Sequence, residues 1–348
     1  MRKLICLLLI LLLPGGALAE KQLVLTFVGD CTIGGEERLR EQDISFDAYL
    51  EKYGYTYFFE KVQSVIGRDD VTVANLESVL SDTAYGRVEK TYNFRGPRHY
   101  VNVLTKSSVE AVNIANNHTF DYGGKGVNHT ANTLDEAGQG WFGSNDVVQR
   151  TWVYEKDGIR IGFLGYEIGF WGYQHRPVVE KQIRSLKEDQ GCQVVVAVMH
   201  GGVEYDKVRH VSQEKCAQGA IKCGADLVIG HHPHVLQGLD VVDGKTICYS
   251  LGNFVFGGNA KIRAPYTALF QFTLHFDDEN NYLGHQLTII PALPSGERAF
   301  NNYQPVLAVG EDALRVMEQI QYDTPFALEP YVEGVGAVQQ FVPALSNK

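Results

Sequence analysis

The sequence is poor in positive charge, in cysteine and in long apolar runs. Its 348 residues include 31 lysines and arginines against 41 acidic residues, which gives a formal net charge of −10. That balance argues against a duplex nucleic-acid binder, because such proteins neutralise phosphates with a basic face. The chain has six cysteines, of which five follow residue 20, and no CxxC pair. An odd number in a chain of this length excludes a dense disulfide framework and leaves a single bridge open.

One long apolar run is present, and it lies at the N-terminus. The ten residues Leu4–Leu13 follow Arg2 and Lys3 and precede a Pro-Gly-Gly break and the small-residue pattern Ala17-Leu18-Ala19. A run of this length is too short to span a hydrocarbon core of about 30 Å as a helix. The three-part pattern predicts a signal peptide over residues 1–19, and therefore a secreted or cell-envelope protein. The alternative is an uncleaved N-terminal membrane anchor. No later segment approaches 18 apolar residues.

Buried strands and amphipathic helices alternate along much of the chain. Near-continuous apolar runs predict strands buried on both faces at Leu23–Val28, Val71–Ala74, Ala111–Ala115, Gln193–Met199 and Asp226–Ile229. Helical periodicity lies between them, over Tyr57–Ile66, Val101–Val109, Gly126–Ala137, Val178–Asp189 and Ser212–Cys223. This alternation predicts an α/β fold.

Antiparallel hairpins are predicted in addition. Asp157-Gly158 and Asp243-Gly244 each separate two short apolar strands, and Asp-Gly is a strong hairpin signal. Tyr266–Phe276 and Tyr282–Ile290 form a third pair, which we expect to extend a second sheet together with Thr246–Phe256. The expected architecture is a mixed sheet system with helices outside. It forms one domain over residues 20–300, and a C-terminal extension over residues 301–348 packs on the same domain.

Polar side chains that can bind a metal follow five of the predicted strands. They are Asp30, Asn75, Glu77, Asn117, His118, Asp121, His200, His231, His232 and His234. Open α/β sheets bind ligands beyond the carboxyl ends of their strands, so we expect these groups to converge at one edge. Three of the chain's 11 histidines lie between residues 231 and 234, which favours metal binding. Taken singly, each residue has an ordinary alternative, such as a turn or capping aspartate or a hydrogen-bonded core histidine.

The donor types limit the metal and its chemistry. Oxygen and imidazole donors without a thiolate cluster suit one or two divalent ions of Mn, Fe or Zn better than copper(I) or an iron–sulfur centre. Cys31, beside Asp30, stays open as a further ligand. A divalent ion lowers the pKa of water and polarises the oxygen under attack, which predicts hydrolysis. We expect His118, with Asp121 close by, to protonate the leaving group, because imidazole titrates near neutral pH.

The chain resembles the CapA-type proteins of capsule and poly-γ-glutamate synthesis. The resemblance runs in order through Gly29-Asp30, Ala74–Ser78, Tyr92–Pro97, Ile114–His118, His200–Tyr205, Gly224–Gly238 and Tyr249–Phe256. The stretches HHPHVLQG and YSLGNFVF within it are highly specific. The resemblance implies a calcineurin-like metallophosphoesterase fold, in which two mixed β-sheets are sandwiched between helices and the metal centre lies where the loops meet.

The resemblance also implies roles for single residues. It gives the part of metal ligands to Asp30, Asn75, Glu77, Asn117, His200, His232 and His234, with Glu77 or Asn75 as the bridge and His231 as an extra histidine. His118 is similar to the general acid or charge stabiliser of that fold. The chain departs from the pattern of this fold at its first motif, where Cys31 and Thr32 follow the aspartate in place of x-His. The bridging motif reads Asn-Leu-Glu instead of Gly-Asp. One site therefore lacks an imidazole, and the other is intact.

The donor set and the resemblance together predict a function. The protein is expected to be an extracytoplasmic metal-dependent hydrolase that cleaves a phosphoester or amide bond during capsule or poly-γ-glutamate biosynthesis. Arg95 and Arg98 suit carboxylate or phosphate groups and are predicted to bind the substrate together with Asn253. Their alternatives are solvated surface charges and a turn residue. Expected partners are an anionic polymer or phosphoester and a membrane synthase or export complex, with no nucleic acid. The alternatives are a non-catalytic polymer-binding or export-complex subunit on the same fold and a nucleotidase-like phosphatase.

Overall fold

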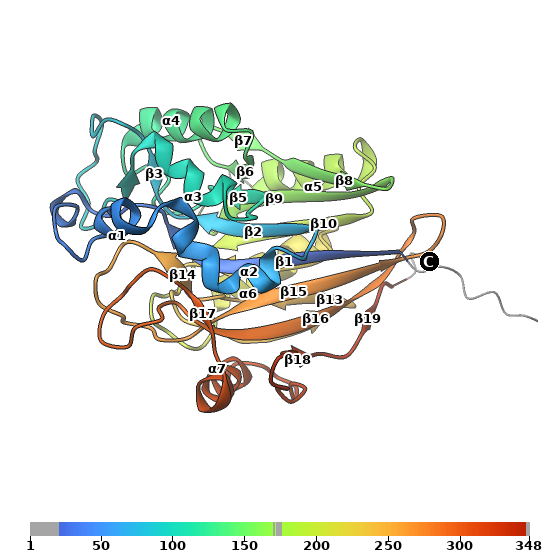
Figure 1. Cartoon of the computed structure of the whole chain (residues 1–348). Coiled ribbons are helices and arrows are strands. Elements are labelled where there is room, and N and C mark those ends of the chain that lie inside the picture. The colour runs from blue at the N-terminus through green and yellow to red at the C-terminus, as the bar shows by residue number, and fades with distance from the viewer. Residues whose placement is uncertain (1–20, 170, 172–175, 346–348) are drawn as a thin grey trace, which may run out of the picture.

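The computed structural model describes residues 21–169, 171 and 176–345, and it contains two mixed β-sheets that lie face to face (Figure 1). In spatial order, the main strands of the first sheet are β5 (Ala111–Asn113), β2 (Val71–Leu76), β1 (Lys21–Thr32), β15 (Thr267–Phe276) and β16 (Tyr282–Leu293). The strands β5, β2 and β1 are parallel, and β15 and β16 are antiparallel to their neighbours. The short strand β14 (Asn253–Phe256) pairs in parallel with the end of β1.

The second sheet has a parallel centre and antiparallel edges. In spatial order its strands are β8 (Trp152–Lys156), β9 (Ile159–Glu167), β10 (Val194–His200), β11 (Leu227–His231), β13 (Lys245–Cys248) and β12 (Leu239–Val242). The strand β6 (Gly140–Ser144) connects the two sheets, because it pairs with β5 and also, through Ser144, with β9.

Further short strands are β3 (Val79–Leu80), β4 (Arg95–Gly96), β7 (Gln149–Arg150), β17 (Val306–Leu307), β18 (Ala337–Val338) and β19 (Val342–Pro343).

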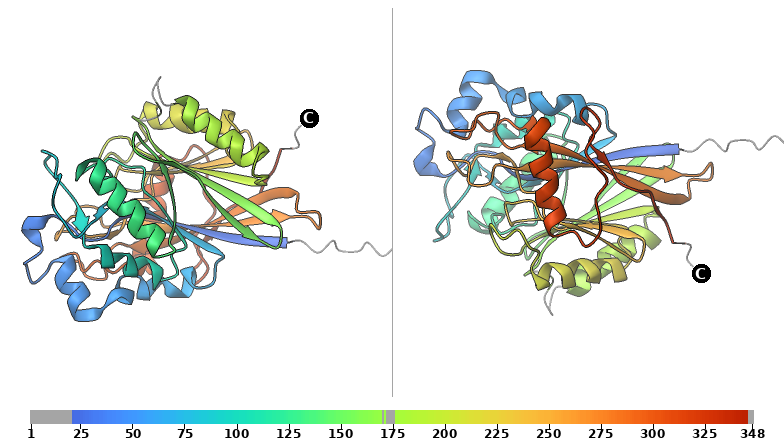
Figure 2. Two further views of the ribbon diagram at one scale, coloured as in Figure 1. Left: turned by 90° about the horizontal axis from the view of Figure 1, so that it is seen from above. Right: turned by 90° about the horizontal axis from the view of Figure 1, so that it is seen from below.

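Helices cover the outer faces of this sandwich (Figure 2). The first sheet is covered by α1 (Phe46–Tyr53), α2 (Gln63–Ile66), α3 (Asn102–Thr105), α4 (Gly123–Glu136) and the 3₁₀ helix η2 (Tyr55–Val62). The second sheet is covered by α5 (Arg176–Glu188) and α6 (Val211–Lys222). The helix α7 (Gly310–Tyr322) packs on β16, and η1 (Glu37–Leu39) and η3 (Arg98–Val101) are short 3₁₀ helices.

Alternating side chains of the central strands fill two separate layers of the core. On β10, Val196 and Val198 point between the sheets, whereas Val195 and Ala197 pack under α5 and α6. All four are buried, as expected for successive residues that face opposite sides of a sheet covered on both faces. This double burial explains why the sequence shows near-continuous apolar runs at the parallel strands.

The α/β architecture with two mixed sheets flanked by helices is confirmed. The hairpins β8–β9, β12–β13 and β15–β16 are also confirmed, with antiparallel pairing throughout. At both Asp-Gly turns the aspartate and the glycine have positive φ, which is the conformation that favours this dipeptide in two-residue turns. The helix α7 begins at Gly310, inside the segment expected as a C-terminal extension.

Several sequence-based boundaries are wrong. The segment Thr246–Phe256 does not extend one sheet, because β13 lies in the second sheet and β14 in the first. Gly252, at φ 70°, turns the chain between them and accepts a hydrogen bond from the backbone N–H of Asp30. The helix expected to reach Val109 ends at Thr105. Most of the helix expected to start at Tyr57 is the 3₁₀ helix η2. The connecting strand β6 was not predicted.

The structure describes the C-terminal segment up to residue 345 but not the first 20 residues. The predicted signal peptide, residues 1–19, lies outside the described residues. Within the described ranges, no helix combines the length and apolar character needed to cross a membrane. The C-terminal segment pairs with β16 through β17, β18 and β19. All five cysteines of the described chain are free.

Candidate metal centre

The carboxyl ends of parallel strands from both sheets meet at one place. Asp30 on β1 lies opposite Asn75 on β2, and His200 at the end of β10 lies opposite His231 at the end of β11. Hydrogen bonds and ion pairs then join the polar side chains at this place into one cluster. Its members are Asp30, Asn75, Glu77, Asn117, His118, Asp121, His200, His231, His232 and His234. The structure therefore brings together every predicted metal ligand, although they are spread over some two hundred positions.

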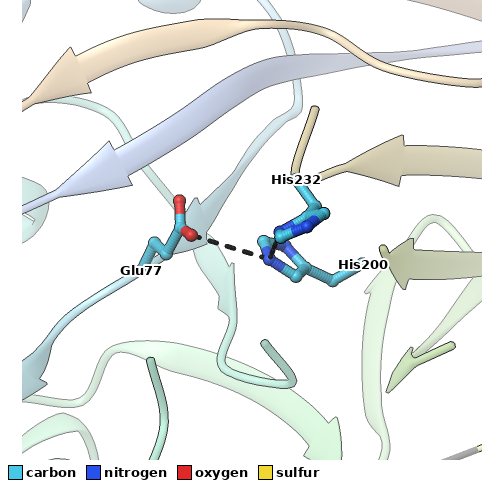
Figure 3. Close-up of side chains that lie close together, drawn as sticks. All are labelled: Glu77, His200 and His232. Carbon is cyan, nitrogen blue, oxygen red and sulfur yellow. Dashed lines mark hydrogen bonds and ion pairs between the residues drawn. The ribbon is translucent and has the colours of Figure 1, made fainter. Parts of the chain in front are cut away.

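The first group of candidate ligands surrounds His200 (Figure 3). The Nε2 atom of His200 lies 2.8 Å from Oδ1 of Asn117, 3.2 Å from Nδ1 of His232 and 3.6 Å from Oε1 of Glu77. Donor atoms that share one metal at bonds of about 2.0–2.2 Å lie roughly 3.0–3.5 Å apart. The three separations are close to that spacing, so this donor set fits a divalent cation.

A second group shares Glu77 with the first. Nε2 of His234 lies 3.9 Å from Oε1 of Glu77, and Nδ1 of His234 lies 3.2 Å from Oδ2 of Asp30. One donor atom from each of these three residues lies within 4.8 Å of the others. His231 contacts the other oxygen of Asp30 at 3.3 Å. The first motif, at Asp30, has no histidine of its own. Imidazoles from the His231–His234 segment lie beside Asp30 instead.

Glu77 carries the clearest sign that a cation belongs here. Its side chain is fully buried, and neither carboxylate oxygen has a hydrogen-bond partner. Burial, followed by the charge of Asp30, raises the pKa of Glu77 well above its ordinary value. A buried carboxylate without a partner is costly, whereas a metal ligand needs free lone pairs. The orphaned oxygens of Glu77 therefore fit a cation that both ligand groups share.

The protonation of the histidines suits the same interpretation. Burial, then the neighbouring His232, lowers the pKa of His200 well below its ordinary value, which favours the neutral ring that binds metals. Burial also lowers the pKa of His232. For His234 burial opposes the charged form, but the carboxylates of Glu77 and Asp30 outweigh it and raise the pKa to about 9. A proton on His234 offsets part of the negative charge of Glu77 and Asp30, which a bound cation would offset in its place.

The backbone of the histidine segment is strained. His232 has φ 99° and His234 has φ 58°, in the region that side chains with a Cβ rarely adopt. The backbone N–H of His232 donates to Oδ2 of Asp30, and Nδ1 of His234 lies 2.9 Å from Oδ1 of Asn253. Such strain costs roughly 1–3 kcal/mol and persists where surrounding contacts over-determine a functional geometry. These contacts aim both rings into the centre.

His118 and Asp121 form a pair at the edge of the centre. Nδ1 of His118 lies 2.7 Å from Oδ2 of Asp121, and its Nε2 lies 3.8 Å from Oε1 of Glu77. Asp121 also accepts hydrogen bonds from the backbone N–H of Phe94 and from Nζ of Lys90. Burial lowers the pKa of His118 although Asp121 opposes this effect. The pair fixes the ring with Nε2 directed toward the candidate ligands.

The residues predicted to bind substrate lie in different places. Asn253 is within the centre, as the partner of His234. The guanidinium of Arg95 is buried and bound to Glu37 and to the carbonyl of Ser81, and Arg98 pairs with Glu136 on α4. These two arginines are committed to structural contacts, which corrects the expectation that they face the substrate.

Other residues of the centre were missed or misjudged from the sequence. Cys31 is buried, its thiol donates to the backbone carbonyl of Gly29, burial raises its pKa, and it belongs to none of the ligand groups among the described residues. Glu204 lies within ligand distance of His232 and His234 at the exposed rim. Lys90 contacts Asp121 from an irregular loop in which no motif marks it.

Comparisons with known proteins agree on one family. The sequence model of the family described as "Bacterial capsule synthesis protein PGA_cap" matches residues 24–258. The chain is 31% identical over 275 residues to "Capsule biosynthesis protein CapA" of Bacillus anthracis, a match that covers 73% of this chain and 64% of that protein. It is 30% identical over 273 residues to "PGA biosynthesis protein CapA" of Bacillus subtilis, which covers 73% and 71%. The match thus spans less than two thirds of the B. anthracis protein.

Two solved structures are similar at low sequence identity. They are the NAD nucleotidase of Haemophilus influenzae, with TM-score 0.46, 11% identity and coverage of 87% of this chain and 63% of that one, and a putative 5'-nucleotidase from Staphylococcus aureus, with TM-score 0.47, 11% identity and coverage of 93% and 71%.

Proposed function

The chain belongs to the family of bacterial capsule synthesis proteins, and from this premise we propose that it is a metal-dependent hydrolase that acts on an anionic capsule polymer outside the cytoplasm. The bond cleaved is a phosphoester or an amide. The observation that supports this proposal most is the buried carboxylate of Glu77, which has no hydrogen-bond partner and faces the imidazoles of His118, His200 and His234 at 3.6–3.9 Å.

The residues that would hold a cation are those of the two ligand groups. Asn117, His200 and His232 form one side, Asp30 and His234 form the other, and Glu77 is common to both. A bound divalent cation would polarise the oxygen under attack and lower the pKa of water in the site. Mn, Fe and Zn all suit such oxygen and imidazole donors.

His118 is the residue proposed to move a proton. The carboxylate of Asp121 can only accept, so the proton on Nδ1 of His118 stays directed toward it. Nε2 is then free to exchange a proton with a leaving group on the side of the candidate ligands. Proton transfer by a positioned side chain contributes roughly 10²–10⁴-fold to rate. The stacked ring of Phe94, 4.2 Å from that of His118, holds the imidazole plane.

The proposed location rests on the N-terminal pattern of the sequence. A basic start, ten apolar residues and a small-residue site predict export, with cleavage after Ala19 or retention of the segment as an anchor. Mass spectrometry of the protein from the cell envelope and the medium tests this. A mature chain that begins at Glu20 supports secretion, an intact N-terminus in the membrane fraction supports the anchor, and an intact chain in the cytoplasm contradicts both.

A second candidate is a non-catalytic polymer-binding subunit of a membrane synthase or export complex. It is favoured by Thr32, which stands where the first motif of the fold has histidine. The Thr32 hydroxyl donates to the backbone carbonyl of Glu77 and so has a structural role. Such a subunit would bind metal and polymer without turnover.

Turnover assays on the metal-loaded full chain separate the two candidates. Bis(p-nitrophenyl) phosphate and poly-γ-glutamate report phosphoester and amide cleavage. We expect turnover of one of them by the wild type, its loss in Glu77→Gln and His118→Asn, and its retention in Glu136→Gln, which makes the same change as the first variant at an exposed carboxylate on α4. No turnover of either substrate by protein that holds its metal would contradict the hydrolase and leave the binding subunit.

A further inference from the structure

Two cationic side chains stand on loops at different sides of the candidate centre and have no role in the proposed chemistry. We infer that Lys90 and Arg263 form a two-point recognition site for a polyanion. Lys90 would bind the anionic group next to the reacting bond, and Arg263 would bind a second anionic group farther along the chain. This inference rests on the proposed function and deepens it, because it makes an oligomer with repeated anionic groups a better ligand than a single anion.

Lys90 is held in place but keeps a free donor. Its Nζ donates to Oδ1 of Asp121 at 2.7 Å and to the backbone carbonyl of Asn117 at 2.8 Å. The third contact, with Nδ1 of His118 at 3.4 Å, is long, and that nitrogen is already committed to Asp121. An ammonium has three donors, so one remains for a ligand. The side chain is 29% exposed, which gives that donor access from solvent.

The loop that carries Lys90 is fixed on Asp121. The backbone N–H of Val88 donates to the carbonyl of Asp121, and the backbone N–H of Phe94 donates to its carboxylate. The side chain of Asn93 donates to the same carbonyl. Because three hydrogen bonds hold the loop on Asp121, the ammonium of Lys90 stays beside Asn117, which is itself a candidate metal ligand. An anion bound there would lie at the edge of the metal centre.

Arg263 approaches from the side of His234. Its guanidinium carbon lies 4.4 Å from the centre of the Tyr205 ring, and that ring lies 6.0 Å from the ring of His234. The backbone N–H of Tyr205 donates to the carbonyl of Pro233, which ties this loop to the histidine segment. Arg263 is exposed, and no carboxylate among residues 21–169, 171 and 176–345 pairs with it. Beyond its contact with Tyr205, its planar fork has further N–H groups that can bind a carboxylate or phosphate.

The acidic groups nearby do not cancel these two cations. Asp121 binds Lys90 but also receives His118 and the backbone of Phe94, so its charge is shared. Glu204 lies with His232 and His234, within 4.8 Å of their ligand nitrogens. Glu77 and Glu167, where burial raises the pKa, are further carboxylates that interact with Lys90. Because Lys90 lies with Asn117 and Asp121 whereas Arg263 lies over Tyr205, we expect an oligomer, and not a single small anion, to contact both cations.

Binding measurements on the metal-loaded full chain test this inference independently of turnover. The probes are inorganic phosphate and poly-γ-glutamate, each titrated calorimetrically. We expect Lys90→Met to weaken both probes by about tenfold or more, the effect of a lost hydrogen bond between charged groups. We expect Arg263→Met to weaken only poly-γ-glutamate, by about threefold or more, as befits a partly solvated charge. Lys90→Arg, which keeps the charge beside Asp121, should retain most of the binding.

Arg98→Met is the matched control, because Arg98 is an arginine already paired with Glu136 on the surface of α4. It should change the affinity for neither probe. Equal weakening of both probes by Arg263→Met, or unchanged binding in the Lys90 and Arg263 variants, would overturn the inference. If the expected pattern is found without any turnover, the recognition site stands and the hydrolase proposal fails. If turnover is found without this pattern of binding, the hydrolase proposal stands and the recognition site fails.

Discussion

Replacing Glu77 with glutamine separates the cost of a buried carboxylate from its use as a ligand. Both oxygens of Glu77 are buried without a hydrogen bond, and three imidazole nitrogens lie 3.6–3.9 Å from Oε1. A buried polar group without a partner costs roughly 1–3 kcal/mol, and more when it is charged. We therefore expect metal-free Glu77→Gln to be no less stable than the metal-free wild type, and more stable by up to about 3 kcal/mol.

Addition of metal should reverse the comparison. A cation that binds only the folded state stabilises it by about 2.7 kcal/mol at a free concentration of about 100 times its Kd. The wild type should gain this stability, and Glu77→Gln should gain little, because the ligand common to both groups is lost. Urea unfolding in EDTA and in Mn²⁺ measures both quantities, and Glu136→Gln should behave as the wild type. A Glu77→Gln variant that is less stable without metal and keeps the full metal-induced gain would refute this reasoning.

Three further predictions concern catalysis, pH dependence and packing. His118→Asn should lower kcat by roughly 10²–10⁴-fold with unchanged metal content, and an unchanged kcat would remove its role. Burial lowers the pKa of His285 to about 4, while hydroxyls of Thr246 and Tyr282 contact its two nitrogens. The unfolded chain protonates near 6.5, so the contribution of His285 to stability is complete above that pH and is lost as pH falls toward 4, by up to about 3 kcal/mol. His285→Gln should flatten this acid limb of urea unfolding, and an identical limb would contradict the assignment. Phe270→Ala, deep between the sheets, should cost about 3–5 kcal/mol in the same assay, and a loss below 1 kcal/mol would contradict the core described above.

The sequence allowed much of the candidate centre to be predicted, because its ligands follow strands. Parallel strands buried on both faces show as apolar runs, and their carboxyl ends meet at one edge, so the polar residue after each run is placed by topology alone. Asp30, His200 and His232 were found in this way, and the structure brings them together. The Asp-Gly hairpins were equally clear, since their signal is local.

The remainder depends on contacts that no local pattern records. Lys90 lies in an irregular loop, and its partner Asp121 is 31 residues away in the sequence, so the contact exists only in the tertiary structure. Arg95 and Arg98 were expected to face the substrate because their side-chain chemistry suits anions, but Glu37 and Glu136 bind them. The strand β6 has five residues and glycines at two of them, so its pairing with both sheets gives little signal along the chain.

Metal content is the most direct test of the central claim that Glu77, His200 and His232 hold a divalent cation. The full chain is dialysed against Mn²⁺, Fe²⁺ or Zn²⁺, freed of excess metal and measured by elemental analysis beside His200→Ala and His232→Ala. We predict at least one tightly bound ion per wild-type chain and a loss of metal in both variants, each of which remains folded by circular dichroism. A wild type that retains no metal, or variants that retain as much as the wild type, would contradict it.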